Sequence, residues 1–196
     1  MKVKHARVCV FVCLLVILLG APGYAETESE MDILDVTQYR TLVDEFGMPT
    51  TESVKEIAEA AQSTFDAGDY EAAIPLLEEW AQSANWLANM IVSGLKPFYR
   101  ASYDDRKEFS YSKVAALVVY ETTANSLKRD RNHAMVMIAE CHVQTGRLDV
   151  AVSMYMKALN LLDVNDWEWW TRAANGLFEL IGMPPIVEKP ASKRWR

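Results

Sequence analysis

The 196-residue sequence has few of the residues that cross-link or interrupt a chain: three Cys, eight Gly and seven Pro. Collagen and flexible low-complexity proteins need far more Gly and Pro, so both classes are excluded. Hydrophobic residues make up 51% and charged residues 24%, which excludes a mainly disordered chain. The net charge of −7 leaves no broad cationic face, so we expect no nucleic-acid partner.

Motifs that carry catalysis or hold a metal or cofactor are also scarce. The one cluster of reactive types is Glu140-Cys141-His142, and consecutive helical residues point about 100° apart, so these three cannot converge on one atom. His133 and His142 fall on opposite sides of a helix and cannot share a metal ion. We therefore expect Cys141 and His142 to be packed in the core, and we predict no enzyme, no cofactor and no metal site.

Residues 1–25 have the pattern of an export signal. Three positive residues precede an apolar run from Val8 to Ala21, and small residues up to Ala25 supply a cleavage site. This run is shorter than the about 20 residues that cross a bilayer, so we expect cleavage and no stable membrane anchor, with an uncleaved anchor as the alternative. Cleavage leaves a single Cys and therefore no intramolecular disulfide. We expect a periplasmic protein, with secretion as the alternative.

Glycine, proline and capping residues divide the remaining chain into helices. We expect an acidic N-terminal segment at 26–52 with one short helix at 36–46, a helical domain at 53–182 and a basic tail at 183–196. Within the domain we expect helices at about 53–67, 70–83, 85–95, 109–128, 132–145, 148–162 and 167–181, with a long loop at 96–108. Ser53 and Glu56 predict a capping box, and Asp166 is expected to cap the last helix. Strand patterns are nearly absent, which indicates an all-α fold.

Two segments of the helical domain look alike. Gly68 and Gly146, which are 78 residues apart, each mark a turn with a small residue in the helix before it. An Ala follows each glycine by five residues, and a large residue follows by nine. The matching residues are Ala61, Ala73 and Leu77 in the first copy and Ala139, Ala151 and Tyr155 in the second. Small residues let two helices approach closely while large ones fill the neighbouring gaps.

This pattern resembles the tetratricopeptide repeat, a helix-turn-helix unit. The resemblance implies a right-handed superhelix of stacked antiparallel helix pairs, closed by a C-terminal capping helix at 167–181. About three stacked pairs make a continuous core. The sequence departs from the family at Trp80, which replaces a second small residue, at Pro75 within a helix, and over 85–128, which has no clean motif. An unrelated α-helical bundle is the alternative.

The first helix of each pair lines a concave groove in tetratricopeptide proteins. By resemblance, the groove residues here are Lys55, Ala58, Gln62, Phe65 and Asp66 in the first copy and His133, Val136, Glu140, Val143 and Gln144 in the second. The resemblance implies an exported, non-catalytic scaffold that binds a protein partner in the cell envelope, and merely solvated positions are the alternative interpretation. Trp167 and Trp169 are candidate exposed aromatic residues for a partner, or a hydrophobic lid on the stack.

Two other functions are kept as alternatives. A small envelope hydrolase could use paired carboxylates, such as Asp104 and Asp105, around the 96–108 loop. A subunit of an envelope complex could instead associate with itself through the Trp-rich end, which would give a homo-oligomer.

Overall fold

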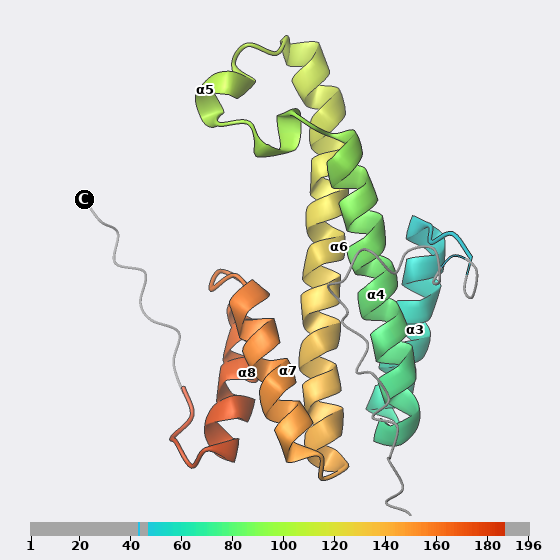
Figure 1. Cartoon of the computed structure of the whole chain (residues 1–196), viewed down its shortest axis with the longest axis vertical. Coiled ribbons are helices and arrows are strands. Elements are labelled where there is room, and N and C mark those ends of the chain that lie inside the picture. Colours follow the sequence, from blue (N-terminus) through green and yellow to red (C-terminus); the bar gives the residue numbers. More distant parts are fainter. Residues whose placement is uncertain (1–42, 44–46, 187–196) are drawn as a thin grey trace, which may run out of the picture. The chain divides into compact units, whose positions relative to one another are not determined.

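The structure is a computed structural model that describes residue 43 and residues 47–186, all of which belong to one compact unit. Over these residues the chain is all-α and contains no strand, as predicted (Figure 1). The export signal predicted at 1–25 and most of the helix expected at 36–46 lie outside the described residues, as does the part of the predicted basic tail beyond residue 186.

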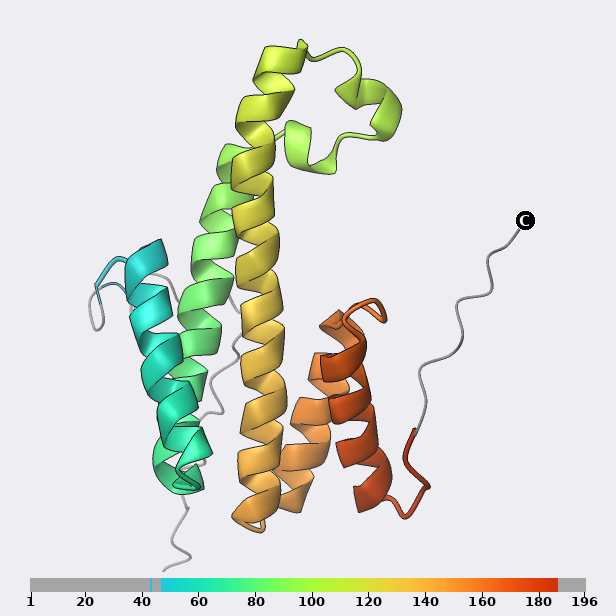
Figure 2. The ribbon, with the colours of Figure 1, turned by 180° about the vertical axis from the view of Figure 1, so that it is seen from behind.

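Six helices and one short turn of 3₁₀ helix make up the described fold. They are α3 (Thr51–Asp66), α4 (Tyr70–Gly94), η2 (Phe98–Arg100), α5 (Tyr103–Arg106), α6 (Tyr111–Gln144), α7 (Leu148–Leu161) and α8 (Trp167–Leu180). The long helices pack in chain order, α3 on α4, α4 on α6, α6 on α7 and α7 on α8, and α8 also contacts α6. Successive helices run antiparallel (Figures 1 and 2). The predicted bounds of α3, α7 and α8 are confirmed to within two residues.

The predicted helix breaks near residue 84 and near residues 129–131 were wrong. Ranges 70–83 and 85–95 form the single helix α4, and ranges 109–128 and 132–145 form the single helix α6. Neither junction contains Gly or Pro, and the polar residues at the two junctions have partners inside the fold. The Arg131 guanidinium donates to Oδ1 of Asn85 at 2.7 Å and to Oδ1 of Asn132 at 2.9 and 3.0 Å. Asn132 Nδ2 donates to the Leu161 carbonyl at 2.9 Å.

These buried side chains join α4, α6 and the end of α7, and they divide the unit into two regions. We call residues 51–85 and 131–180 the stack, and residues 86–130 the arm. The arm consists of the second part of α4, the first part of α6 and the segment between them (Figures 1 and 2). This segment is not a plain loop, because Arg106 of α5 pairs with both Glu121 oxygens on α6, at 2.6 and 3.1 Å.

Three turns of the stack share one geometry. Gly68, Gly146 and Gly182 have φ of 79°, 78° and 72°, a left-handed conformation that a Cβ disfavours. In each turn the glycine N–H donates to the carbonyl three residues back, and the next N–H donates to the carbonyl five residues back, at 2.8–3.3 Å. The predicted equivalence of the first two turns is confirmed. The sequence marks Gly182 as the end of the last helix, but its equivalence to the other two turns was not predicted.

The small residues singled out by the repeat pattern lie at helix contacts. Their relative exposure is 0% at Ala61, Ala73, Ala139 and Ala151. The paired large residues, Leu77 and Tyr155, are also buried. Close helix packing in the stack therefore depends on these alanines, since any larger side chain would push the helices apart.

Two predicted caps were corrected by the structure. Thr50, not Ser53, is the N-cap of α3, and the two residues form the capping box together, with Ser53 in the position expected for Glu56. The helix therefore begins two residues earlier than predicted. Asp166 does stand at the N-cap of α8, but its side chain makes no cap hydrogen bond, because its carboxylate binds His133 instead.

Candidate functional site

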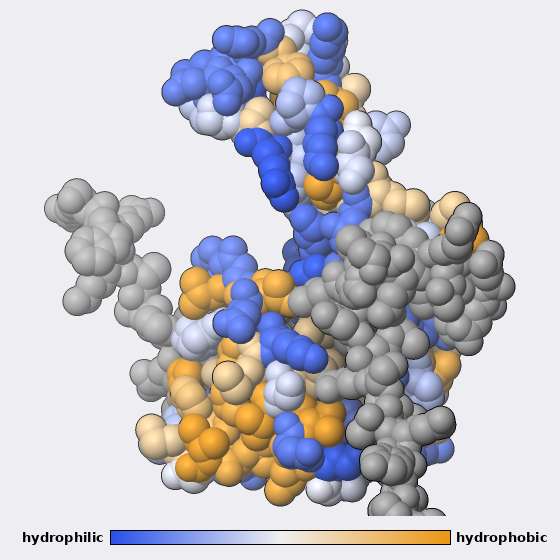
Figure 3. Space-filling model, viewed as in Figure 1, coloured by the Kyte–Doolittle hydropathy of each residue, from blue (hydrophilic) through white to orange (hydrophobic). Residues whose placement is uncertain are grey.

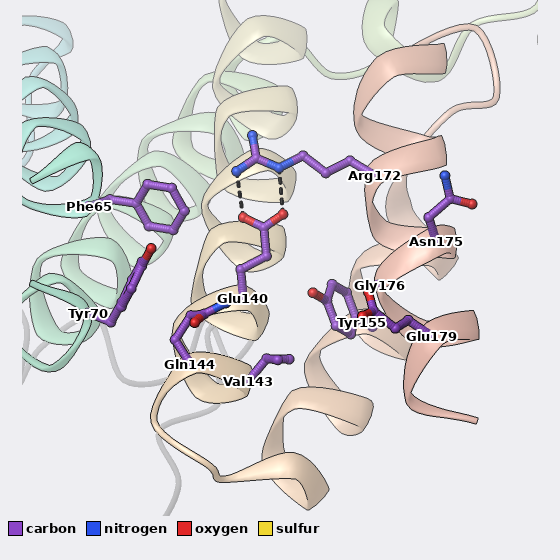
Figure 4. Close-up of a pocket in the computed structure, with 10 residues that line it drawn as sticks. All are labelled: Phe65, Tyr70, Glu140, Val143, Gln144, Tyr155, Arg172, Asn175, Gly176 and Glu179. Atoms are coloured by element: carbon purple, nitrogen blue, oxygen red, sulfur yellow. Dashed lines mark hydrogen bonds and ion pairs between the residues drawn. The ribbon is translucent and has the colours of Figure 1, made fainter. Parts of the chain in front are cut away.

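A pocket of about 380 Å³ opens between α3, α6 and α8 (Figure 4). One side carries Phe65 at the end of α3 and Tyr70 at the start of α4, whose rings meet edge to face at 5.6 Å and 76°. The other side is formed by α8, and Glu140 of α6 lies between them. The pocket therefore combines an aromatic wall with charged and amide groups.

An ion pair crosses the centre of the pocket. The Arg172 guanidinium of α8 donates through Nε and Nη2 to the two carboxylate oxygens of Glu140 (Figure 4). These hydrogen bonds, helped by the negative charge of Glu140, raise the pKa of Arg172. The guanidinium also lies over the Trp169 ring at 4.5 Å and near the Phe65 ring at 5.7 Å. Arg172 thereby connects α8 to α6 and α3.

Tyr155 of α7 closes the floor of the pocket. Its ring reaches α8 at Gly176, where an added Cβ would overlap the ring, so glycine provides the room for this contact. Burial raises the pKa of Tyr155, so the phenol stays neutral in any physiological range.

At the edge of the pocket, the side chain of Asn175 on α8 binds the backbone of Ile186. Its Nδ2 donates to the Ile186 carbonyl at 3.2 Å, and its Oδ1 accepts from the Ile186 N–H at 2.6 Å. Residues 183–186 are not helical and include Pro184 and Pro185. One side-chain amide thus satisfies both backbone groups of a residue in an irregular segment.

Of the predicted groove residues, Phe65, Glu140, Val143 and Gln144 line this pocket. The structure places the others elsewhere. Lys55, Gln62 and Asp66 are exposed on α3 but do not line it. Val136 has a relative exposure of 0%, so its assignment to an open groove was wrong: it faces the packed interior of the stack.

His133 is engaged within the fold. Its Nε2 lies 2.6 Å from Asp166 Oδ2, and its ring stacks on Trp169 at 4.2 Å between centroids and 10° between planes. Trp167 stacks on Trp170 at 5.6 Å and 23°. Trp167 and Trp169 are both half-buried rather than fully exposed. His133 and the two tryptophans therefore help to attach the start of α8.

Six pocket residues were not predicted from the sequence: Tyr70, Tyr155, Arg172, Asn175, Gly176 and Glu179. The signal that could have found those of α8 is the turn at Gly182. Glu179 precedes this glycine by three residues, as Phe65 precedes Gly68 and Val143 precedes Gly146. A capping helix and the first helix of another pair have similar sequences. The glycine turn that follows the helix is the feature that distinguishes them.

The reactive residues outside the pocket that the sequence analysis considered are either buried or paired with neighbouring side chains. Cys141 is fully buried as expected, and burial, together with the nearby Glu140, raises the pKa of its thiol to about 12. Around the 96–108 loop, Asp104 pairs with Lys107 at 2.7 Å, and Asp105 accepts from the Ser102 hydroxyl at 2.8 Å. In the described part of the chain no three His, Cys, Asp or Glu residues are grouped to hold a metal ion.

None of the helices in the described ranges is long and apolar enough to span a bilayer. Protein-family models, curated proteins and solved structures were all compared with this chain, and none of them matches it.

Proposed function

We propose that this chain is a non-catalytic scaffold of the tetratricopeptide type, which holds an irregular or extended segment of a protein partner in the pocket between α3, α6 and α8. The Asn175 side chain is the observation that carries this proposal. It binds both the N–H and the carbonyl of Ile186 at the pocket edge, which is how a side-chain amide recognises a peptide backbone.

The chemistry of the pocket agrees with a peptide ligand. Phe65 and Tyr70 present rings against which an apolar side chain of the partner can pack. Glu140 and Arg172 already neutralise each other, so the partner need not bring a charge of either sign. Gln144 lies at the rim and supplies a neutral donor and acceptor, and the Asn175 amide keeps a second N–H and a second lone pair beyond those that Ile186 uses.

The three equivalent glycine turns support the proposal that the scaffold is of the tetratricopeptide type. The three helices between which the pocket opens, α3, α6 and α8, each end at such a turn, whereas α4 and α7, which also contribute lining residues, do not. In a right-handed superhelix of paired helices, α3, α6 and α8 would be the first helices of successive pairs. Under this proposal α8 is the first helix of a third pair rather than a cap.

We also propose that the scaffold works in the cell envelope, after export. The support is the leader at residues 1–25 and the single Cys that remains after its removal. The test is N-terminal sequencing of the protein from the envelope fraction of its host. A mature N-terminus near Glu26 is expected, and a cytosolic protein that begins at Met1 would contradict export.

The binding function is tested by site-specific photo-crosslinking followed by affinity measurement. A photoreactive residue at Gln144, in the pocket, should capture a defined protein, whereas the same residue at Asn160, exposed on α7, should not. With that protein purified, Asn175→Ala should weaken the Kd by about tenfold or more, since hot-spot polar contacts contribute on this scale.

Lys55→Ala is the matched control, because Lys55 is exposed on α3 outside the pocket and should leave the Kd unchanged. Equal capture from positions 144 and 160 would refute the pocket as the binding site. An unchanged Kd for Asn175→Ala would refute backbone recognition by this side chain.

A further inference from the structure

The chain turns back along α8 after this helix ends. In the turn at Gly182, the next N–H donates to the carbonyl five residues back at 2.8 Å, which reverses the direction of the chain. Four residues beyond this glycine, Ile186 meets the side chain of Asn175, which precedes the glycine by seven residues. Residues 183–186, which we call the return segment, therefore run antiparallel to α8 over about two of its turns.

The return segment has no regular secondary structure, and few contacts hold it. Pro184 and Pro185 have no N–H and restrict the residues before them to extended conformations. None of its four residues is buried, and Met183 is 54% exposed. Beyond the turn, the hydrogen bonds that hold it are the two made by the Asn175 side chain. A segment with so little buried surface is released more easily than a packed helix.

Asn175 stands where the other two units of the stack have an alanine. Ala61 and Ala139 also precede their turn glycine by seven residues, and both have a relative exposure of 0%. The helices α4 and α7 follow those two turns, whereas no helix follows Gly182 within the described residues. A polar side chain thus replaces a small one at the position where the returning chain is extended and needs partners for its backbone groups.

The Asn175 amide can pair with one extended residue at a time. An extended residue turns its N–H and its carbonyl to the same side, and an amide meets both along the edge where its own N–H and an oxygen lone pair lie side by side. Ile186 occupies this edge, with its N–H 2.6 Å from Oδ1 and its carbonyl 3.2 Å from Nδ2. The second N–H and the second lone pair of the amide point in different directions and cannot both meet one further residue. A partner residue bound through both of its backbone groups must therefore displace Ile186.

The return segment also indicates which kind of backbone this edge accepts. The bound residue must keep its own N–H, so it is not a proline, and it must lie outside any helix or sheet that would use its backbone groups. Prolines directly before it ensure an extended chain, as Pro184 and Pro185 do here. The rings of Phe65 and Tyr70 line the same pocket, and aromatic rings are the surfaces on which extended proline-containing segments dock.

We propose that the return segment is an internal competitor of the pocket, and that the partner binds through an extended, proline-containing segment that takes the place of Ile186 on Asn175. This inference rests on the proposed function, since it names the ligand class and the regulation of that same site. In the chain alone, Ile186 keeps the amide edge of Asn175 engaged. The apparent affinity for a partner is then reduced by the fraction of chains in which this edge is closed.

The first test is the binding of a fluorescent peptide with the sequence of residues 182–189 to the full chain, followed by anisotropy. Ile186→Pro in the protein removes the N–H that competes for Oδ1 of Asn175. It should tighten the Kd for the peptide by about fivefold, the factor that one hydrogen bond contributes. Ile186→Val keeps the N–H and is the matched control, with an unchanged Kd. Equal affinities of Ile186→Pro and the unmodified chain would overturn the competition.

The peptide itself can be changed in the same way. A peptide with proline in place of its isoleucine has no N–H to donate to Oδ1 of Asn175, and it should bind about fivefold more weakly. Both protein variants should keep the helical content of the unmodified chain, because Ile186 lies outside the helices. A peptide that binds equally well after this change would overturn recognition through both backbone groups.

The second test is hydrogen exchange at the Ile186 amide, measured by NMR in the full chain. This amide should be protected in the chain alone, and Asn175→Ala should remove the protection, because Oδ1 is its acceptor. A saturating concentration of the peptide should accelerate the exchange about tenfold or more. Peptide binding with unchanged exchange at Ile186 would overturn the internal competition and leave the proposed function intact.

Failure of the peptide to bind either the unmodified chain or Ile186→Pro would overturn the proline-containing ligand class. The proposed function is decided separately, by the photo-crosslinking at Gln144, which does not use this peptide.

Discussion

The two ends of α6 have opposite surroundings although they belong to one continuous helix. In the stack, ten of the twelve residues from Arg131 to His142 are buried. In the arm, none of the residues from Tyr111 to Thr123 is buried. The sequence is apolar in both stretches, so composition does not distinguish them. What differs is the number of neighbouring helices: α6 is enclosed by α4, α7 and α8 in the stack and lies beside α4 and the α5 segment in the arm.

The hydropathy of the molecular surface also differs between the two regions (Figure 3). The region of α7 and α8 is largely hydrophobic, whereas the α5 end of the arm is largely hydrophilic (Figure 3). Short charged elements such as α5 cover one side of the arm and make ion pairs with it, as Arg106 does with Glu121. A second pocket, of about 310 Å³, lies in the arm between Leu95 of the α4 end and Leu117 of α6. In the arm, α6 is therefore held by its contacts with α4 and with the α5 segment.

The largest expected effect comes from the junction between the two regions. Asn132→Ala removes the Oδ1 that accepts from the buried Arg131 guanidinium and the donor to the Leu161 carbonyl. Burial already lowers the pKa of Arg131, which reflects the penalty on its charged form. We expect a loss of about 2–4 kcal/mol in the free energy of unfolding, measured by urea denaturation.

Asn125→Ala is the matched control in the arm of the same helix. Asn125 is exposed and accepts one hydrogen bond from the Tyr99 hydroxyl at 2.8 Å. Its replacement should change stability by no more than about 0.5 kcal/mol. Equal losses for the two variants would mean that the junction is no more important than the arm surface.

A smaller difference is expected between glycines of the two regions. Gly146→Ala, in the stack, forces a Cβ into the left-handed conformation at φ 78° and should destabilise by about 1–2 kcal/mol. Gly94→Ala, at the end of α4 in the arm, meets nothing within 4 Å and should stabilise by about 0.5 kcal/mol. Thermal unfolding followed by circular dichroism measures both, and two shifts of the same sign would contradict the assigned backbone conformations.

The smallest effect depends on pH and concerns Asp130, at the border of the two regions. Burial raises the pKa of its carboxyl, although His133 and Arg129 act against this. The folded chain therefore binds this proton more tightly than the unfolded chain, and stability decreases as pH rises from the unfolded pKa, about 4, through the raised folded value.

Asp130→Asn removes this titration and should raise stability near pH 7 by up to about 1 kcal/mol. The gain should vanish below about pH 4, where the wild-type carboxyl is protonated in both states. Urea denaturation at a series of pH values measures the difference, with Glu56→Gln on the exposed side of α3 as the control. A gain that persists in acid would show that charge is not its cause.

Local signals in the sequence were sufficient for much of the fold. Gly68 and Gly146 marked two turns correctly, because a helix that must reverse needs a residue without a Cβ at that point. Repeated alanines marked the close helix contacts for a similar reason. The predicted breaks in α4 and α6 were wrong because neither junction contains a Gly or Pro, and the polar residues there, Asn85, Arg131 and Asn132, satisfy one another across helices.

The candidate site was predicted in part. The resemblance to the tetratricopeptide repeat placed Phe65, Glu140 and Gln144 on the groove face of their helices, and all three line the pocket. Arg172 and Asn175 could not be found in this way, because Gly182 was interpreted as the end of a capping helix and not as a third equivalent turn. Val136 has the same helical periodicity as an open groove residue and is nevertheless buried.

By itself, the sequence determined that the described chain is helical, where several of its helices turn and which small residues lie at their contacts, because these properties depend on backbone conformation and side-chain size within one or two turns of helix. Only the tertiary structure decided that α4 and α6 continue past the stack, that Glu140 meets Arg172, and which apolar residues of α6 are buried. Those outcomes depend on which distant helices come together, and no local pattern of residues encodes that information.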